Sequence, residues 1–96
     1  MTTYFVTRHP GARAWAEAQG IRVDRQVDHL DVAAVNPGDM VIGSLPVNLA
    51  AVVCARGARY MHLSLVVPPQ LRGVELSAQQ MNELGAVVEE YRVVRV

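Results

Sequence analysis

The stretch Thr3-Tyr4-Phe5-Val6-Thr7-Arg8-His9-Pro10-Gly11-Ala12 decides how this chain folds. Its first five residues are all β-branched or aromatic, which predicts a buried strand. Pro10 suits the first turn of a helix, because its missing N–H group costs nothing there, and we expect a helix from Ala12 to Gln19. A strand that passes through a short polar turn into a helix places that turn at the carboxyl edge of a sheet, where open α/β sheets bind their ligands.

The middle of the chain continues the alternation of strands and helices. Gly20 ends the first helix, and Ile21–Val27 alternates like a half-buried strand near the sheet margin. After one expected helical turn within Asp28–Pro37, the apolar run Met40–Ile42 is typical of a central parallel strand. A second helix is expected from Pro46 to Arg56, and its apolar face comprises Leu49, Val52 and Val53.

The last third of the chain predicts two further strands and one helix. Tyr60–Val67 alternates like a strand, and the capping-box pattern Ser77–Gln80 starts a helix that we expect to bury side chains as far as Tyr91. Arg92–Val96 predicts a final short strand. This order predicts one α/β domain over residues 1–96, a small Rossmann-like fold whose mostly parallel sheet is flanked by helices.

Composition narrows the class of protein. A chain of 96 residues with 51% hydrophobic residues fits one domain, and we attribute part of this high fraction to a subunit interface. Zero net charge argues against a protein that coats DNA or another long nucleic acid. All nine basic residues are arginine, which reflects either GC-rich codon usage or a choice of bidentate phosphate ligands.

Targeting signals and cysteine content predict a cytoplasmic protein. No apolar run approaches the roughly 20 residues that span a bilayer, so no membrane association is expected. The first residues lack the basic segment and apolar core of a signal peptide. Cys54 is the single cysteine, is expected to be a small core residue, and cannot form an internal disulfide.

Three loops are expected to meet at the same carboxyl edge: Thr7–Gly11, Gly43–Pro46 and Val67–Gly73. Two of them open helices, whose N-termini carry a partial positive charge, so we expect a phosphate-bearing ligand. Glycines 11 and 43 would let that ligand approach the backbone closely. The predicted site residues are Thr7, Arg8, His9, Pro10, Gly11, Gly43, Ser44, Leu45, Asn48 and Arg72.

Each candidate also has a purely structural explanation. Arg8 could form a surface ion pair, His9 could cap the first helix, and Ser44 could be an N-cap of the second. Asn48 could be solvated and His62 packed within its strand. The group His29, Asp28 and Asp31 is better explained as a solvated turn than as a metal site. Because the sequence also lacks a Walker P-loop, a G-x-G-x-x-G motif and zinc spacing, no metal or cofactor is expected.

Several strings of the sequence resemble a known family. They are Tyr4–Ala12 with Trp15-Ala16, His29-Leu30-Asp31, Gly38-Asp39, Val41–Ala50 and Arg72–Leu76. In combination they resemble the small Csx-type proteins encoded beside type III CRISPR systems, and the resemblance spans nearly the whole chain. It implies a stand-alone ring nuclease: a compact, dimeric relative of the CARF (CRISPR-associated Rossmann) fold. Such proteins bind a cyclic oligoadenylate, mainly cyclic tetra-adenylate, and linearise it, which switches off the antiviral response.

The resemblance suggests how the predicted loops would act. Two copies of the carboxyl edge across a dimer axis would match a cyclic ligand with four phosphates. Each ribose 2′-OH can attack its adjacent phosphate without a metal, leaving a 2′,3′-cyclic phosphate. Arg8 would stabilise the phosphorane and His9 would act as general acid or base. Ser44 and Asn48 would hold phosphate or base, and Arg72 would close over the ligand.

Two other classes of function fit the same sequence. The first is a dimer that sequesters or senses the cyclic nucleotide without cutting it, which predicts tight binding and an intact ligand. The second is a structural subunit of a CRISPR complex, in which the excess of apolar residues forms a partner surface. That subunit would have no nucleotide affinity and would co-purify with another protein.

Overall fold

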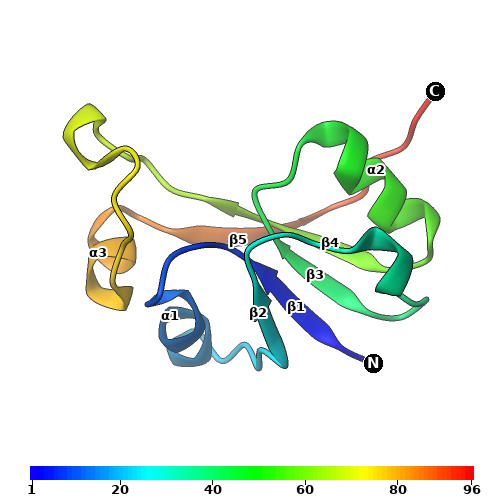
Figure 1. Cartoon of the computed structure of the whole chain (residues 1–96), viewed down its shortest axis with the longest axis horizontal. Helices are drawn as coiled ribbons and strands as arrows, with labels where there is room; N and C mark the ends of the chain where they lie inside the picture. Colours follow the sequence, from blue (N-terminus) through cyan, green and yellow to red (C-terminus); the bar gives the residue numbers. More distant parts are fainter.

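The computed structural model describes residues 1–96 and contains one five-stranded sheet with helices on both faces (Figure 1). The strands follow the order β2-β1-β3-β4-β5, and every pair is parallel except β4 with β5. This confirms the predicted α/β fold with a mostly parallel sheet. The elements are β1 (Thr3–Val6), α1 (Ala12–Ala18), β2 (Arg25–Val27), η1 (Val32–Ala34), β3 (Met40–Gly43), α2 (Val47–Ala55), β4 (Arg59–Ser64), η2 (Pro69–Leu71), α3 (Ala78–Glu83) and β5 (Val87–Tyr91), where η marks a 3-10 turn.

Two hydrophobic cores lie on opposite faces of the sheet, because neighbouring strand residues point to opposite sides. Helices α1 and α3 cover one face and α2 with η1 covers the other (Figure 1). The α1/α3 core contains Phe5, Ala12, Trp15, Ala16, Val23, Ile42, Leu63, Leu76 and Met81. The α2 core contains Val35, Val41, Ala50, Val53, Ala58 and Tyr60. The apolar run of β3 contributes to both cores, which confirms its prediction as a central strand.

The predicted last helix is too long, and the last strand lies earlier than predicted. Helix α3 ends at Glu83, and Gly85 adopts a left-handed conformation with φ +72° that carries the chain away from the helix. Val87–Tyr91 then pairs antiparallel with β4, whereas residues 92–96 form no strand. The apolar spacing in this region fits a helix as well as a strand. The left-handed conformation of Gly85 ends the helix, and the free edge of β4 provides the partner with which Val87–Tyr91 forms a strand.

Three further details differ from the expectation, the first being that β4 runs over Arg59–Ser64 and not over Tyr60–Val67. Only Arg25–Val27 of the predicted strand 21–27 pairs with β1, although it lies at the sheet margin as expected. In α2 the buried residues are Ala50 and Val53, while Val52 is 40% exposed. Of the predicted apolar face, Val53 is buried and Leu49 is half-buried, whereas Val52 is wrong, because the sheet lies on the side of Ala50 and Val53.

Candidate functional site

The carboxyl ends of β1, β3 and β4 lie side by side at one edge of the sheet. Val6 pairs with Gly43, and Gly43 pairs with His62, so β1 and β3 end at the same level and β4 runs on past it to Ser64. Paired positions on neighbouring strands lie about 5 Å apart, which places Thr7 and Ser44, the next residues on β1 and β3, close together. The first two predicted loops therefore adjoin each other, as the strand order requires.

His9 lies on the turn after β1 and is held in place by hydrogen bonds. Its Nδ1 accepts the Leu76 N–H at 3.0 Å, and its carbonyl oxygen accepts the Gln26 side-chain amide at 2.8 Å. The Thr7 hydroxyl oxygen accepts the His9 N–H at 3.1 Å. Because Nδ1 is an acceptor, the hydrogen of the neutral ring is assigned to Nε2, so His9 presents a donor to a ligand.

Gly11 fits closely against the segment that leads into α3. A Cβ at this position would lie 2.1 Å from the Ala78 nitrogen and 2.4 Å from the Ser77 carbonyl carbon. The Gly11 N–H donates to the Leu76 carbonyl, and the Ala12 N–H donates to the His9 carbonyl. Close packing therefore explains the glycine at position 11 without a ligand. The two amides at the start of α1 are already hydrogen-bonded.

The turn from β3 into α2 offers both occupied and free donors. The Ser44 hydroxyl donates to the Leu63 carbonyl at 2.6 Å, and the Leu45 N–H donates to the Tyr60 hydroxyl at 3.0 Å. The N-cap of α2 is Pro46, which has no side-chain cap, so Ser44 is not the cap that the sequence allowed. The N–H groups of Val47 and Asn48 in the first turn of α2 have no acceptor within the chain.

Gly43 is buried where β1 and β3 approach each other. A Cβ there would lie 3.1 Å from the Val6 carbonyl oxygen and 3.3 Å from the Val6 Cβ, which is tighter than most real contacts. Its lack of a side chain is therefore explained by strand packing as well as by ligand approach. Whether a ligand approaches Gly11 or Gly43 stays a prediction.

The two predicted arginines are exposed and lack ion-pair partners. Arg8 and Arg72 make no side-chain hydrogen bond and no salt bridge, whereas Arg13, Arg22 and Arg59 each pair with a carboxylate. The ion pair considered for Arg8 is not formed, which leaves its guanidinium available. Arg72 follows η2 in the segment between β4 and α3, which projects from the body of the molecule (Figure 1). The structure does not bring Arg72 into contact with the other two loops.

Tyr60 was not predicted as a site residue, and the structure places it behind the predicted site. Its hydroxyl accepts the Leu45 N–H, lies 3.1 Å from the Gly43 carbonyl oxygen and is hydrogen-bonded to His62 Nδ1. Burial raises the pKa of the Tyr60 phenol above its ordinary value, and the Leu45 N–H opposes this effect only in part. The phenol therefore stays neutral. The shared face of Tyr60 and His62, two residues apart on a strand, was the available signal.

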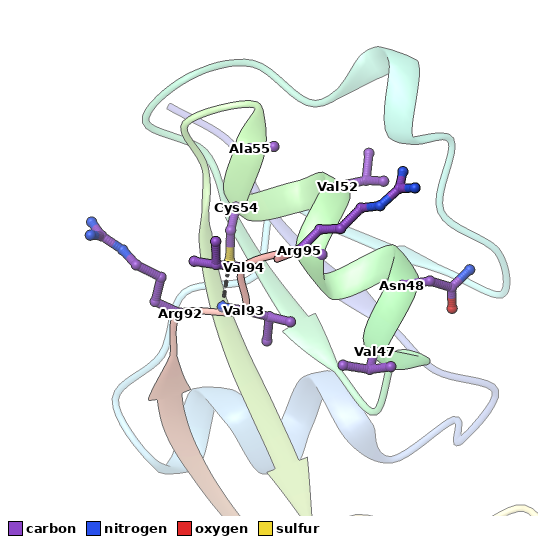
Figure 2. A pocket seen from close by; sticks show the side chains of 10 residues that line it. Val47, Asn48, Val52, Cys54, Ala55, Arg92, Val93, Val94 and Arg95 are labelled. Carbon is purple, nitrogen blue, oxygen red and sulfur yellow. Dashed lines mark hydrogen bonds between the residues drawn. The ribbon is translucent and has the colours of Figure 1, made fainter.

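A broad groove of ≈ 930 Å³ lies elsewhere, between α2 and the residues after β5 (Figure 2). Of the predicted site residues it includes only Asn48, whose side chain projects outward from α2 in Figure 2. Cys54 lines the groove at the edge of the α2 core, with the Val93 N–H 3.4 Å from its Sγ (Figure 2). The groove is lined by Val47, Asn48, Ala51, Val52, Cys54, Ala55, Arg92, Val93, Val94 and Arg95.

The His29 turn has a structural explanation. The Asp31 carboxylate accepts the Ala33 N–H at 3.1 Å and caps η1. His29 and Asp28 are exposed, as expected for a solvated turn. No group of three or more His, Cys, Asp or Glu side chains lies close enough together to hold a metal ion.

A comparison with known protein families shows to which family the chain belongs. The model of the family described as "Putative CRISPR-associated protein (Cas_VVA1548)" matches residues 4–94. The protein belongs to this CRISPR-associated family. The match begins at Tyr4 within β1 and runs past β5, and it therefore includes all three loops of the carboxyl edge. No curated protein and no solved structure matches the chain. None of its helices has the length and hydrophobicity to cross a membrane.

Proposed function

We propose that this protein is a metal-independent ring nuclease that binds cyclic tetra-adenylate and linearises it in the cytoplasm, ending type III CRISPR signalling. The observation that carries the proposal is the carboxyl edge. There the turn after β1 carries Arg8, whose guanidinium is unpaired. The adjacent turn after β3 leads into α2, where the N–H groups of Val47 and Asn48 are free. Such donors bind phosphate oxygens, and membership of a CRISPR-associated family supports a nucleotide messenger as their source.

The proposed reaction is an internal transphosphorylation. The ribose 2′-oxygen bonds to the adjacent phosphorus, the bond from phosphorus to the 5′-oxygen breaks, and a 2′,3′-cyclic phosphate remains. The proton of the 2′-OH passes to solvent water, and the 5′-oxygen takes up a proton from water. Arg8 and the amides of Val47 and Asn48 would stabilise the negative charge of the phosphorane.

His9 stabilises the leaving side of this reaction as a hydrogen-bond donor, because loss of the Nε2 proton from a neutral ring would leave an imidazolate. Its Nδ1 is occupied by the Leu76 N–H, so its Nε2–H would donate to the leaving 5′-oxygen or to a phosphate oxygen. The same hydrogen bond argues against His9 as the base that takes the 2′-OH proton. Ser44 keeps lone pairs that could accept from a ribose hydroxyl, and the projecting Arg72 would close over the bound ring.

A homodimer would complete the site. A ring with four phosphates and pseudo-twofold symmetry is matched by two copies of the same edge across a twofold axis. Thr7, Pro10, Gly11, Gly43 and Leu45 would form the walls of this shared site.

A second candidate is a homodimer that sequesters the ring without cutting it. It is favoured by the donor-rich character of the edge, where Arg8, His9 and the α2 amides all donate. Such a set of groups binds phosphates but does not itself supply a base.

The test is incubation of the purified protein with cyclic tetra-adenylate in EDTA, with chromatography of the products. The proposal expects linear products that end in a 2′,3′-cyclic phosphate. Arg8→Ala is expected to slow the single-turnover rate by about 10²-fold or more. The matched control is Arg25→Ala, because Arg25 is also exposed and unpaired but lies beside Tyr4, away from the carboxyl edge.

Each of the other outcomes contradicts a different part of the proposal. Loss of all cleavage in EDTA would remove the metal-free mechanism. A ring that is bound but intact after long incubation would favour the sequestering dimer. Absence of binding would overturn both and favour a structural subunit of a CRISPR complex.

A further inference from the structure

The Tyr60 hydroxyl holds both sides of the turn that connects β3 to α2. Tyr60 is 2% exposed and projects from β4 toward the α2 core. Its oxygen accepts the Leu45 N–H at 3.0 Å and lies 3.1 Å from the Gly43 carbonyl oxygen. One side chain from a neighbouring strand thus fixes the peptide groups before and after Ser44.

His62 fixes the Tyr60 hydroxyl in turn. The His62 Nδ1 is hydrogen-bonded to this hydroxyl, and the two rings pack edge to face with centroids 5.7 Å apart. On its other side His62 packs edge to face against Tyr91 of β5 at 5.8 Å. The ring is therefore held between two aromatic residues.

The hydrogens of this network can be distributed so that every bond is satisfied. If His62 carries a hydrogen on Nδ1, it donates to the Tyr60 oxygen, which also accepts from Leu45. The phenol hydrogen then points to the Gly43 carbonyl oxygen. The pKa of the Tyr60 phenol is raised by burial, which keeps this hydrogen in place.

The turn that Tyr60 holds leads directly into the free amides of Val47 and Asn48. The direction of these N–H groups is set by the path of the chain through Gly43–Pro46, because α2 begins one residue later. We propose that Tyr60, held by His62, is a positioning residue that aims the first amides of α2 at the bound phosphate. This inference rests on the proposed function.

The experiment compares Tyr60→Phe with Tyr4→Phe. Both substitutions remove one hydroxyl from the same face of the sheet, but the Tyr4 hydroxyl makes no hydrogen bond within the chain. Isothermal titration with cyclic tetra-adenylate is expected to give about tenfold weaker binding for Tyr60→Phe, and wild-type affinity for Tyr4→Phe. His62→Phe keeps the ring packing and is expected to weaken binding by about threefold, because the contacts of Tyr60 with Gly43 and Leu45 remain.

Amide hydrogen exchange gives a readout that does not depend on the ligand. In folded Tyr60→Phe the Leu45 N–H is expected to exchange at least tenfold faster, while the amides of β1 keep their protection. An unchanged Leu45 exchange rate would overturn the positioning role whatever the protein binds. Faster exchange with unchanged affinity would also overturn it. If Leu45 exchanges faster in Tyr60→Phe but the wild-type protein does not bind cyclic tetra-adenylate, the proposed function is overturned. Tyr60 then remains the residue that orders this turn.

Discussion

Gly11→Ala tests the contact that joins the turn after β1 to the segment before α3. Gly11 has φ −82°, which alanine adopts without strain, so the effect of the substitution is steric. The new Cβ would lie 2.1 Å from the Ala78 nitrogen, whereas ordinary contact begins at 3.4 Å, so the two backbones must separate by more than an ångström. That movement would break the hydrogen bonds from Gly11 to Leu76 and from Leu76 to His9.

The expected loss of stability follows from these contacts. Overpacking typically costs about 1–3 kcal/mol, and each lost hydrogen bond adds about 1 kcal/mol, so we expect a loss of about 3 kcal/mol or more. For a domain of this size, such a loss lowers Tm by about 12 °C or more. Urea unfolding can be followed by the fluorescence of Trp15, the single tryptophan, which is 3% exposed.

The matched control is Gly20→Ala. Gly20 has φ +82° and nothing within 4 Å of its Cβ position, so alanine there is expected to cost only about 1–2 kcal/mol of left-handed strain. If Gly11→Ala proves no less stable than Gly20→Ala, the close packing between the turn and residues 76–78 is refuted.

Three further predictions test other parts of the structure. Val53→Ala is expected to lower the free energy of unfolding in urea by about 2–3 kcal/mol, whereas Val52→Ala lowers it by about 0.5 kcal/mol or less, because only Val53 is buried. Equal losses would contradict the orientation of α2. The N–H groups of Asn36 and Thr2 hold the pKa of the Asp39 carboxyl below its ordinary value, so its stabilising effect is present at neutral pH and is lost as the pH falls through this lowered pKa. Asp39→Asn should therefore have a lower Tm than the wild type at pH 7, and the gap should narrow below about pH 4; a gap that stays constant with pH would refute this. His9→Asn keeps an acceptor for the Leu76 N–H but loses the distal donor, so it should keep wild-type Tm and lose ring cleavage; full cleavage by this variant would remove His9 from the reaction.

The sequence predicted those features that depend on neighbouring residues. The buried strand before Thr7, the apolar strand at Met40–Ile42 and the helix after Pro46 all follow from short-range patterns, and together they place the polar loops at one edge. Gly20 ends the first helix with positive φ, as expected. The adjacency of the first two loops then follows from the parallel strand order.

The features that the sequence did not predict depend on contacts between distant segments of the chain. The fit of Gly11 against Ser77 and Ala78, and the bond from Leu76 to His9 across 67 positions, leave no local trace in the sequence. Strand β5 was missed because its apolar residues also fit the helical period of α3, and the strand is selected by the left-handed Gly85 together with pairing to β4. The role of Tyr60 likewise depends on a turn fifteen residues earlier.

The most direct test of the account is an NMR titration of the ¹⁵N-labelled protein with cyclic tetra-adenylate. The largest amide shifts are expected within residues 7–11 and 43–48, with Val47 and Asn48 among them, and residues 92–95 are expected to change little. Shifts confined to the groove between α2 and residues 92–95, or no shifts at all, would contradict the claim that the carboxyl edge binds the ring.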